Sequence, residues 1–254
     1  MSQFGFGTGT LWAAQTQDAS GNVIANLTPI KFGELQDVSI DISRDVKLLH
    51  GQLSFPSAVG GGKGKIEMKA KFARIMGKLL SDIVFGQTLT TGTLTGVVND
   101  TTGAAIPGTP YQITPTIPSS GTWVRDLGVV SSLGLPLTRV ASAPATGQYS
   151  VAAGVYTFAA ADTGLTVFIS YTYTATAATA KSMTLTNLPM GYLPTFGVDL
   201  AMQFSGKQTN WRFPNCTAPK MTFNPKQDDF TQIDLDIQIF ADSSGNVGYA
   251  YTQE

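Results

Sequence analysis

Hydrophobic residues occupy every second position over four stretches of this chain, and polar residues fill most of the positions between them. In residues 37–49, Val38, Ile40 and Ile42 alternate with aspartates and serine. A period of two is typical of a strand with one buried and one solvated face, and strands of this kind build antiparallel sheets. The pattern predicts a mainly β fold with strands at 37–49, 65–72, 198–204 and 232–239.

A different period follows the second of these strands. Between residues 72 and 86 the apolar side chains recur at intervals of three and four, which is typical of one face of an amphipathic helix. Gly86 is suited to end such a helix, because glycine adopts the left-handed C-terminal conformation without strain. We expect one helix covering the open side of a sheet, with an apolar face of Phe72, Ile75, Met76, Leu79, Leu80 and Ile83.

Two turn signals share one five-residue pattern. Residues 18–22 and 242–246 both follow the order Asp-x-Ser-Gly-Asn. Aspartate and asparagine bond to their own backbone in turns and glycine supplies positive φ, so both stretches are predicted to be hairpin tips. A calcium loop would require further oxygen ligands at alternate positions, which neither stretch has.

The composition changes near Thr88 and again near Lys181. Only five charged residues lie between these points, and short strand patterns bounded by turn signals fill the segment. We expect a β-domain formed by residues 1–87 and 181–254, with a small all-β unit, 88–180, inserted into it. The Ala- and Thr-rich residues 174–182 are expected to form the exit linker. The predicted strands of the insert lie at 110–115, 147–151, 155–159 and 166–174.

Charge and cysteine content narrow the classes of function. The chain of 254 residues has 13% charged residues and a formal net charge of -1, so it presents no overall field that attracts nucleic acid or an anionic membrane. The single cysteine excludes an intrachain disulfide and fits a reducing compartment. The sequence starts without a signal-peptide pattern and has no apolar run near the ~18 residues of a membrane span, so we expect no membrane insertion.

A glycine-rich stretch before the second strand resembles a phosphate-binding loop at first sight. The Walker pattern requires G-x-x-x-x-G-K-[ST] at the start of a helix, but Gly64-Lys65 is followed by Ile66 and by a predicted strand. We therefore exclude a nucleotide site and expect a long mobile loop over Phe55–Gly64. Its characteristic residues are Phe55, Pro56, Ser57, Gly60, Gly61, Gly62 and Lys63.

No constellation for catalysis or metal binding is visible. His50 is the only histidine, and it precedes a glycine at a predicted strand end. Cys216 stands between two prolines with no base nearby and is expected to be a small buried residue. Asp228 and Asp229 are adjacent, so on an extended segment they point to opposite sides. We expect no catalytic residue, no cofactor and no metal, and no enzymatic activity.

Charged residues mark the hydrophilic faces of the predicted strands. Lys65, Lys69 and Lys71 share one face, which is expected to be solvated or paired with acidic residues, because a nucleic-acid surface would interleave exposed aromatic residues with the lysines. Aspartates occupy the corresponding positions of three other strands. These acidic positions are Asp37, Asp41, Asp199, Asp234 and Asp236.

Long stretches of the chain resemble one protein family. Residues 33–86 and 213–251 are similar to the N-terminal half and the closing strands of the major tail tube proteins of long-tailed bacteriophages. Residues 147–174 are similar to a segment found within such tail proteins. The order of strand, Gly-rich connection, lysine-bearing strand and helix carries the resemblance, which covers most of the chain and contains no catalytic motif.

The resemblance implies a β-sandwich or barrel with one flanking α-helix. Six copies form a ring whose inner strands join into one continuous barrel, and stacked rings form a tube around the tape measure protein. Genomic DNA later passes through this tube without specific binding. The other implied partners are the tail terminator and the distal tail or baseplate proteins. The implied location is the virion tail, after assembly in the host cytoplasm.

A structural tube protein is therefore our first hypothesis. The alternatives are a β-rich surface or adhesion module, which the Thr-rich insert alone would suggest, and the inner tube of a contractile tail. Under the first hypothesis the Gly-rich loop lies between stacked rings and the insert faces outward. The five acidic positions line the lumen, and the lysine face is the competing candidate for that place.

Overall fold

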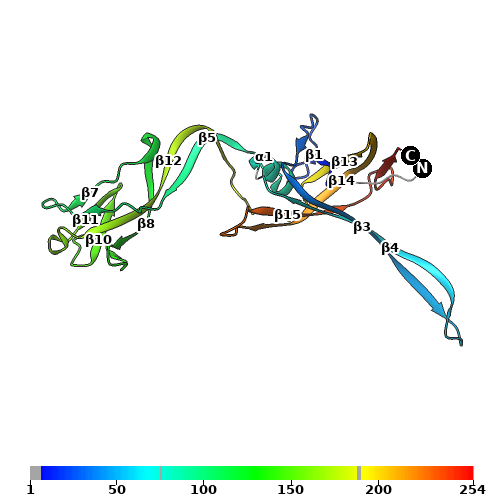
Figure 1. Cartoon of the computed structure of the whole chain (residues 1–254), viewed down its shortest axis with the longest axis horizontal. Helices are drawn as coiled ribbons and strands as arrows, with labels where there is room; N and C mark the ends of the chain where they lie inside the picture. The colour runs from blue at the N-terminus through cyan, green and yellow to red at the C-terminus, as the bar shows by residue number, and fades with distance from the viewer. Residues whose placement is uncertain (1–6, 75, 188–189, 254) are drawn as a thin grey trace. The chain divides into compact units, whose positions relative to one another are not determined.

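The computed structural model describes residues 7–74, 76–187 and 190–253, which fold into two compact units. Unit 1 comprises Met1–Leu89 and Met183–Glu254, and unit 2 comprises Thr90–Ser182. Strands make up most of each unit (Figure 1). The prediction of a mainly β chain is confirmed.

Unit 1 is built on one eight-stranded antiparallel sheet in the order β2-β1-β13-β14-β15-β4-β3, with β16 also paired to β14. The four alternating stretches of the sequence lie in β3, β4, β13 and β15, as predicted. The strands are β1 (Thr10–Gln17), β2 (Ile30–Lys31), β3 (Leu35–His50), β4 (Pro56–Phe72), β13 (Thr195–Phe204), β14 (Lys207–Asn224), β15 (Gln232–Ile239) and β16 (Tyr249–Thr252).

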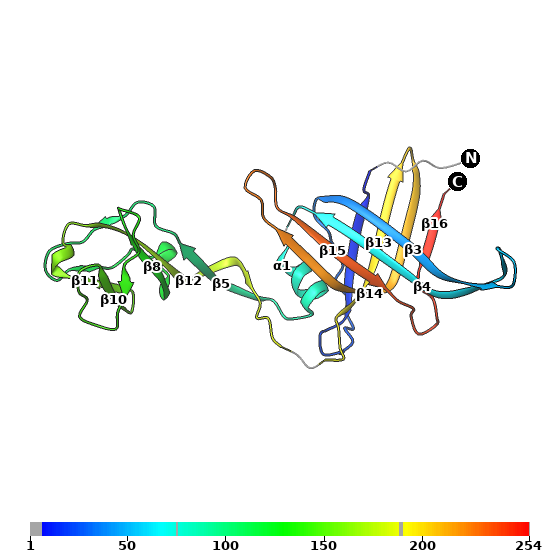
Figure 2. The ribbon, with the colours of Figure 1, turned by 90° about the horizontal axis from the view of Figure 1, so that it is seen from below.

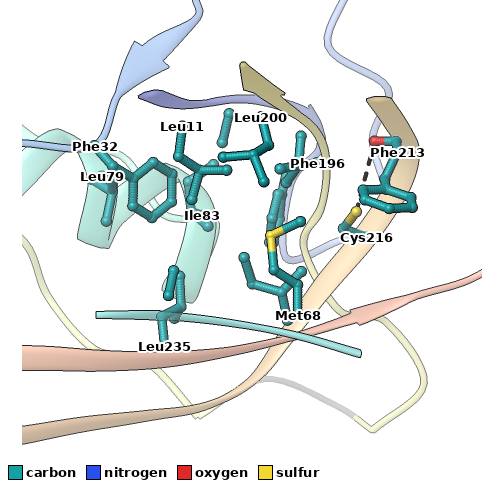
Figure 3. Packing of buried hydrophobic residues seen from close by; sticks show 14 of the residues in the cluster. Leu11, Phe32, Met68, Leu79, Ile83, Phe196, Leu200, Phe213, Cys216 and Leu235 are labelled. Atoms are coloured by element: carbon teal, nitrogen blue, oxygen red, sulfur yellow. Dashed lines mark hydrogen bonds between the residues drawn. The ribbon is translucent and has the colours of Figure 1, made fainter. Parts of the chain in front are cut away.

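The strand β14 is long enough to serve both halves of this sheet. Its first part pairs with β13 and β16, and its second part pairs with β15. Cys216 lies at the changeover, opposite Phe196 on one side and Ile239 on the other. The two halves face each other across the core, with Leu200 and Leu235 on opposite sides (Figure 3). The sheet is open, with a path from β2 to β3, so the barrel expected as an alternative is not found in one chain.

The apolar half of the alternating pattern fills the core of unit 1. In β4, Met68, Ala70 and Phe72 are at most 1% exposed, whereas the lysines between them keep contact with solvent. Burying a large apolar side chain contributes about 1.5–3 kcal/mol before conformational entropy is counted. Phe72 also meets Phe32 edge to face, with ring centroids 5.3 Å apart.

One helical segment closes this core, as the three-and-four spacing predicts. It consists of α1 (Gly77–Leu79), which continues as a π-helical turn, η1 (Leu80–Phe85). Leu79 and Ile83 are buried in the core and lie beside Phe32 in Figure 3. Gly86 ends the segment with φ 60°, in the left-handed conformation that glycine adopts without strain.

The helix begins later than the sequence predicts. Phe72 is the last residue of β4 and pairs with Ile233 on one side and Leu35 on the other. Two hydrogen-bonded neighbours hold this position in the sheet, so it does not join the helix. Ile75, the next residue of the expected apolar face, lies outside the described residues.

Both Asp-x-Ser-Gly-Asn stretches are turns, as predicted, and the leading aspartate holds each one. The Asp18 carboxylate accepts hydrogen bonds from the backbone N–H groups of Ser20 (2.8 Å) and Asn22 (2.9 Å). A further bond from the Asn22 side chain lowers the pKa of Asp18 below its ordinary value. Asp242 repeats this arrangement. The second turn connects β15 to β16, which both pair with β14, so it is not a hairpin tip.

The stretch Phe55–Gly64 is largely a strand and not the loop that its glycines suggest. Strand β4 begins at Pro56, and its glycine run stays paired with β3, with Val46 opposite Gly61. The glycines at 60–62 have no positive φ, so they are extended and the reversal of the chain falls in residues 51–55. Glycine keeps both backbone hydrogen-bonding groups, and a partner strand is therefore enough to hold a glycine run in a ladder.

Unit 2 contains two four-stranded sheets, one with β12 at its centre and one in the order β7-β11-β10-β9. The predicted strands of the insert are found in β7, β10, β11 and β12. The prediction of a linker at 174–182 is wrong, because β12 continues to Ser182 and pairs there with β5. The elements are β5 (Thr90–Val98), β6 (Ala104–Ala105), β7 (Gln112–Ile113), η2 (Pro118–Ser120), β8 (Thr122–Ser131), β9 (Thr138–Arg139), β10 (Gln148–Ala152), β11 (Val155–Phe158), η3 (Ala160–Asp162) and β12 (Thr166–Ser182).

A buried carboxylate ties the two sheets of unit 2 together. The Asp126 side chain is 4% exposed and accepts hydrogen bonds from the hydroxyls of Tyr149 (2.7 Å) and Tyr156 (3.1 Å) and from the N–H of Gly128 (3.0 Å). Burial of the two hydroxyls, together with the nearby Asp126 carboxylate, raises the pKa of each tyrosine well above the usual range for tyrosine. Arg139 lies 3.8 Å away at the surface. The carboxylate is thus satisfied by donors from both sheets.

We predict that Asp126→Ala lowers the stability of unit 2 by about 3 kcal/mol, because it leaves two buried hydroxyls without their acceptor. Urea denaturation followed by tryptophan fluorescence measures this, since Trp123 lies in the same core. The control is Arg139→Ala, which removes only an exposed partner and is expected to change stability by less than about 1 kcal/mol. Equal losses in both variants would contradict the account.

Candidate functional site

The most prominent surface feature of unit 1 is a two-stranded ribbon, which we define as residues 44–64. Strand β15 pairs with β4 only from Ile66 to Phe72, so the earlier part of β4 has β3 as its partner and both strands leave the body of the sheet. Figures 1 and 2 show this ribbon extending from the end of β3 and β4. His50 lies at its end, on β3.

The ribbon exposes apolar side chains along its length. Near the tip, Leu53 is 82% and Phe55 83% exposed, and the large apolar residues of its two strands are each more than half exposed. Residues 48–62 contain no Asp, Glu, Lys or Arg. A two-stranded ribbon is at best marginally stable alone in water, and contiguous exposed apolar surface marks an interaction site. The further exposed apolar residues are Val46, Leu48, Leu49 and Val59.

The outer edge of β3 is a second unsatisfied feature. Within the described ranges, β3 pairs with β4 alone over its 16 residues. Its other edge therefore presents free N–H and C=O groups, which form a template for pairing with another strand. The ribbon and this edge belong to the same hairpin.

The solvent face of β3, β4, β15 and β14 carries charges of both signs in ordered rows. Lys71 lies between Asp37 on β3 and Asp234 on β15, and its Nζ is 3.6 Å from the Asp234 carboxylate. In the next row, Asp236 lies between Lys69 and Lys220. Directly opposite residues on neighbouring strands are in contact distance, so each row alternates in sign.

Four of the five predicted acidic positions are brought together on this charged face. Asp41 lies opposite Glu67, and Lys65 relieves the repulsion with an ion pair of 2.7 Å to Glu67. Asp199 is separate, because it lies on β13 beside Arg212, at 3.8 Å. The charged face comprises Asp37, Asp41, Glu67, Asp234, Asp236, Lys65, Lys69, Lys71 and Lys220.

The charged face is therefore nearly balanced and not a purely acidic stripe. The sequence showed the lysines of β4 and the acids of its neighbours, but only the register places them side by side. The surface is slightly hollowed, with about 320 Å³ over its two central rows. A face of alternating sign offers no extended positive region to a phosphate backbone.

The residues considered for catalysis are apart from one another. Cys216 is buried, as predicted, and burial raises the pKa of its thiol to about 12. His50 is exposed at the ribbon. Asp228 and Asp229 lie in the exposed loop before β15, where Asp229 pairs with Lys226 at 3.7 Å. No group of three or more His, Cys, Asp or Glu that could hold a metal ion occurs in the part of the chain that the structure describes.

Neither the described helices nor comparison with known proteins indicates a further site. No helix among residues 7–74, 76–187 and 190–253 is long and apolar enough to cross a membrane. Comparison of the chain with models of known protein families and with curated proteins finds no match.

We predict that Lys71→Asp destabilises unit 1 by about 1 kcal/mol at low salt, because it places three carboxylates in one row across β3, β4 and β15. Added salt is expected to recover most of this loss by screening. Thermal unfolding at two salt concentrations measures both effects.

The matched control is Lys47→Asp, which lies on the same hairpin opposite Gly60 and has no facing carboxylate. If both variants lose the same stability with the same salt dependence, the alternating rows do not contribute.

Proposed function

We propose that this chain is a structural subunit that polymerises into a tube of stacked rings, as in the major tail tube of a long-tailed bacteriophage. The observation that carries the proposal is the ribbon of residues 44–64. It is paired only within itself, exposes apolar side chains near its tip at more than 80%, and lacks any partner in its own chain over the described ranges. We infer that another molecule supplies the partner for this exposed surface.

The free edge of β3 supports lateral association. An edge of 16 residues is a hazard in a monomer, because it pairs with any available strand. Closure of a ring satisfies such edges and limits the number of copies. The sheet of one chain is open, so a continuous barrel arises only if neighbouring copies extend the sheet.

The charged face supports a place in the lumen under the same proposal. Its apolar side is committed to the core, so the charged side faces solvent, and in a ring one solvent region is the channel. Alternating rows of Asp and Lys give DNA no continuous positive track, which suits passage without specific binding. The five acidic positions expected there are reduced to four by the separate location of Asp199.

Unit 2 is proposed to decorate the outside of the tube. It has its own core of aromatic and aliphatic residues, and its first and last strands start and finish as direct neighbours, with Thr90 opposite Ser182. A unit with adjacent ends is inserted into a chain with little disturbance of the host domain. The tape measure, terminator and distal tail proteins are proposed as partners on the same basis.

The test is electron microscopy of the purified protein and of a variant without the ribbon. Residues 45–63 are replaced by Asn-Gly, which joins Arg44 to Gly64, a pair that already faces each other, through a two-residue hairpin turn. We expect rings or tubes from the natural sequence. The shortened variant should remain folded but yield no tubes, with at least a tenfold loss of sedimentable protein.

The matched control removes unit 2 instead. Replacing residues 90–182 by a short Gly/Ser linker is expected to leave tubes intact but thinner. Failure of a folded unit 2 deletion to polymerise would place unit 2 in the wall. A natural chain that stays monomeric at all concentrations and binds cell surfaces would favour the adhesion module.

A further inference from the structure

Two adjoining hollows lie at the base of the ribbon, and the larger one is mainly apolar. They have volumes of about 400 Å³ and 350 Å³ and share Ile42, Ile66 and Val247 in their linings. Phe240 borders one of them and Trp211 the other. We call these five residues the base hollow.

The base hollow is the open end of the unit 1 core. Ile42 is 55% and Phe240 41% exposed, whereas Ile66, Trp211 and Val247 pack against the buried cluster. The apolar face of the sheet thus extends beyond the core at this point and is exposed to solvent. Apolar surface continuous with a core and left uncovered is an interaction site.

The ribbon tip has the chemistry to fill this hollow. Leu53 and Phe55 are the most exposed apolar residues of the ribbon, and residues 48–62 contain no Asp, Glu, Lys or Arg. The charged residues that line the base hollow are Arg44 and Lys65. An uncharged tip therefore meets no electrostatic repulsion from these two cations.

The tip does not reach the hollow of its own chain. His50 lies eight positions beyond Ile42 along β3, which is about 26 Å at the rise of a β-strand. The occupant is therefore a different molecule. Tip and hollow are different surfaces of one chain, so each copy offers both, and the contact between them is heterologous and repeats from copy to copy.

We propose that Leu53 and Phe55 of one copy insert into the base hollow of a second copy. This inference rests on the proposed function, since it names the receptor for the ribbon in the polymer. The inserted tip lies beside the base of the receiving ribbon, so each junction covers apolar surface of two ribbons.

Complementation of two variants tests the proposal. Phe55→Asp spoils the tip and Phe240→Asp spoils the hollow, and both sites are exposed enough for the fold to persist, as unchanged melting temperatures would verify. Each variant alone is expected to lose layer-to-layer association. In a one-to-one mixture, the intact tip of the Phe240→Asp variant meets the intact hollow of the Phe55→Asp variant. This single junction is expected to double the mass of the species seen with either variant alone, without further growth. Growth stops because the remaining tips and hollows all carry a substitution.

A crosslink provides an independent readout. Phe55→Cys combined with Phe240→Cys is expected to give a disulfide-linked ladder of chains on mild oxidation, since the natural Cys216 is buried. The control combines Phe55→Cys with Leu133→Cys in unit 2, where Leu133 is 77% exposed, and is expected to give no ladder.

The outcomes separate the two claims. Natural protein that assembles, together with a Phe240→Asp variant that assembles equally well and no ladder, overturns the base hollow as receptor and leaves the proposed function standing. Natural protein that never assembles overturns both. A disulfide from the cysteine introduced at position 240 to an added protein, formed in place of the bond to the cysteine introduced at position 55, would assign the hollow to that partner and overturn the second copy as occupant.

Discussion

The pairing of β3 with β4 is the interaction on which the other features of unit 1 depend. Near Met68 it places one row of side chains in the core and the opposite row on the charged face. The same ladder continues past Ile42 and Ile66, where no third strand of the described residues accompanies it, and becomes the ribbon. A single hydrogen-bonded hairpin therefore joins a stable core, an ordered charged surface and an apolar arm that its own chain leaves uncovered.

The sequence was sufficient wherever a local rule decides the outcome. Period-two alternation identified β3, β4, β13 and β15, and Gly86 ended the helix as the C-cap rule predicts. The errors arose where a distant partner decides. The glycines at 60–62 form a strand because they pair with β3. Residues 174–182 form a strand because they pair with β5. The Asp126 network of unit 2 had no local signal, since its two tyrosine donors are more than 20 residues away.

The candidate site was predictable in its parts and not in its arrangement. Aspartates and lysines on alternate positions were evident, and an ion pair between the two kinds of face was one of the alternatives. Only the register shows that acidic strands flank a basic one, which converts an acidic stripe into balanced rows. The same holds for the base hollow, because Ile42 comes from β3, Trp211 from β14, and Phe240 and Val247 from the connection between β15 and β16.

The central claim is that the ribbon finds its partner in another copy of the chain. Hydrogen–deuterium exchange on dilute monomer and on assembled protein tests this most directly, because it reports on the backbone of residues 44–64 without any substitution. The account predicts rapid exchange of the ribbon in the monomer and protection of at least tenfold on assembly, with little change in the core strand β15. Equal exchange of the ribbon in both states would contradict it.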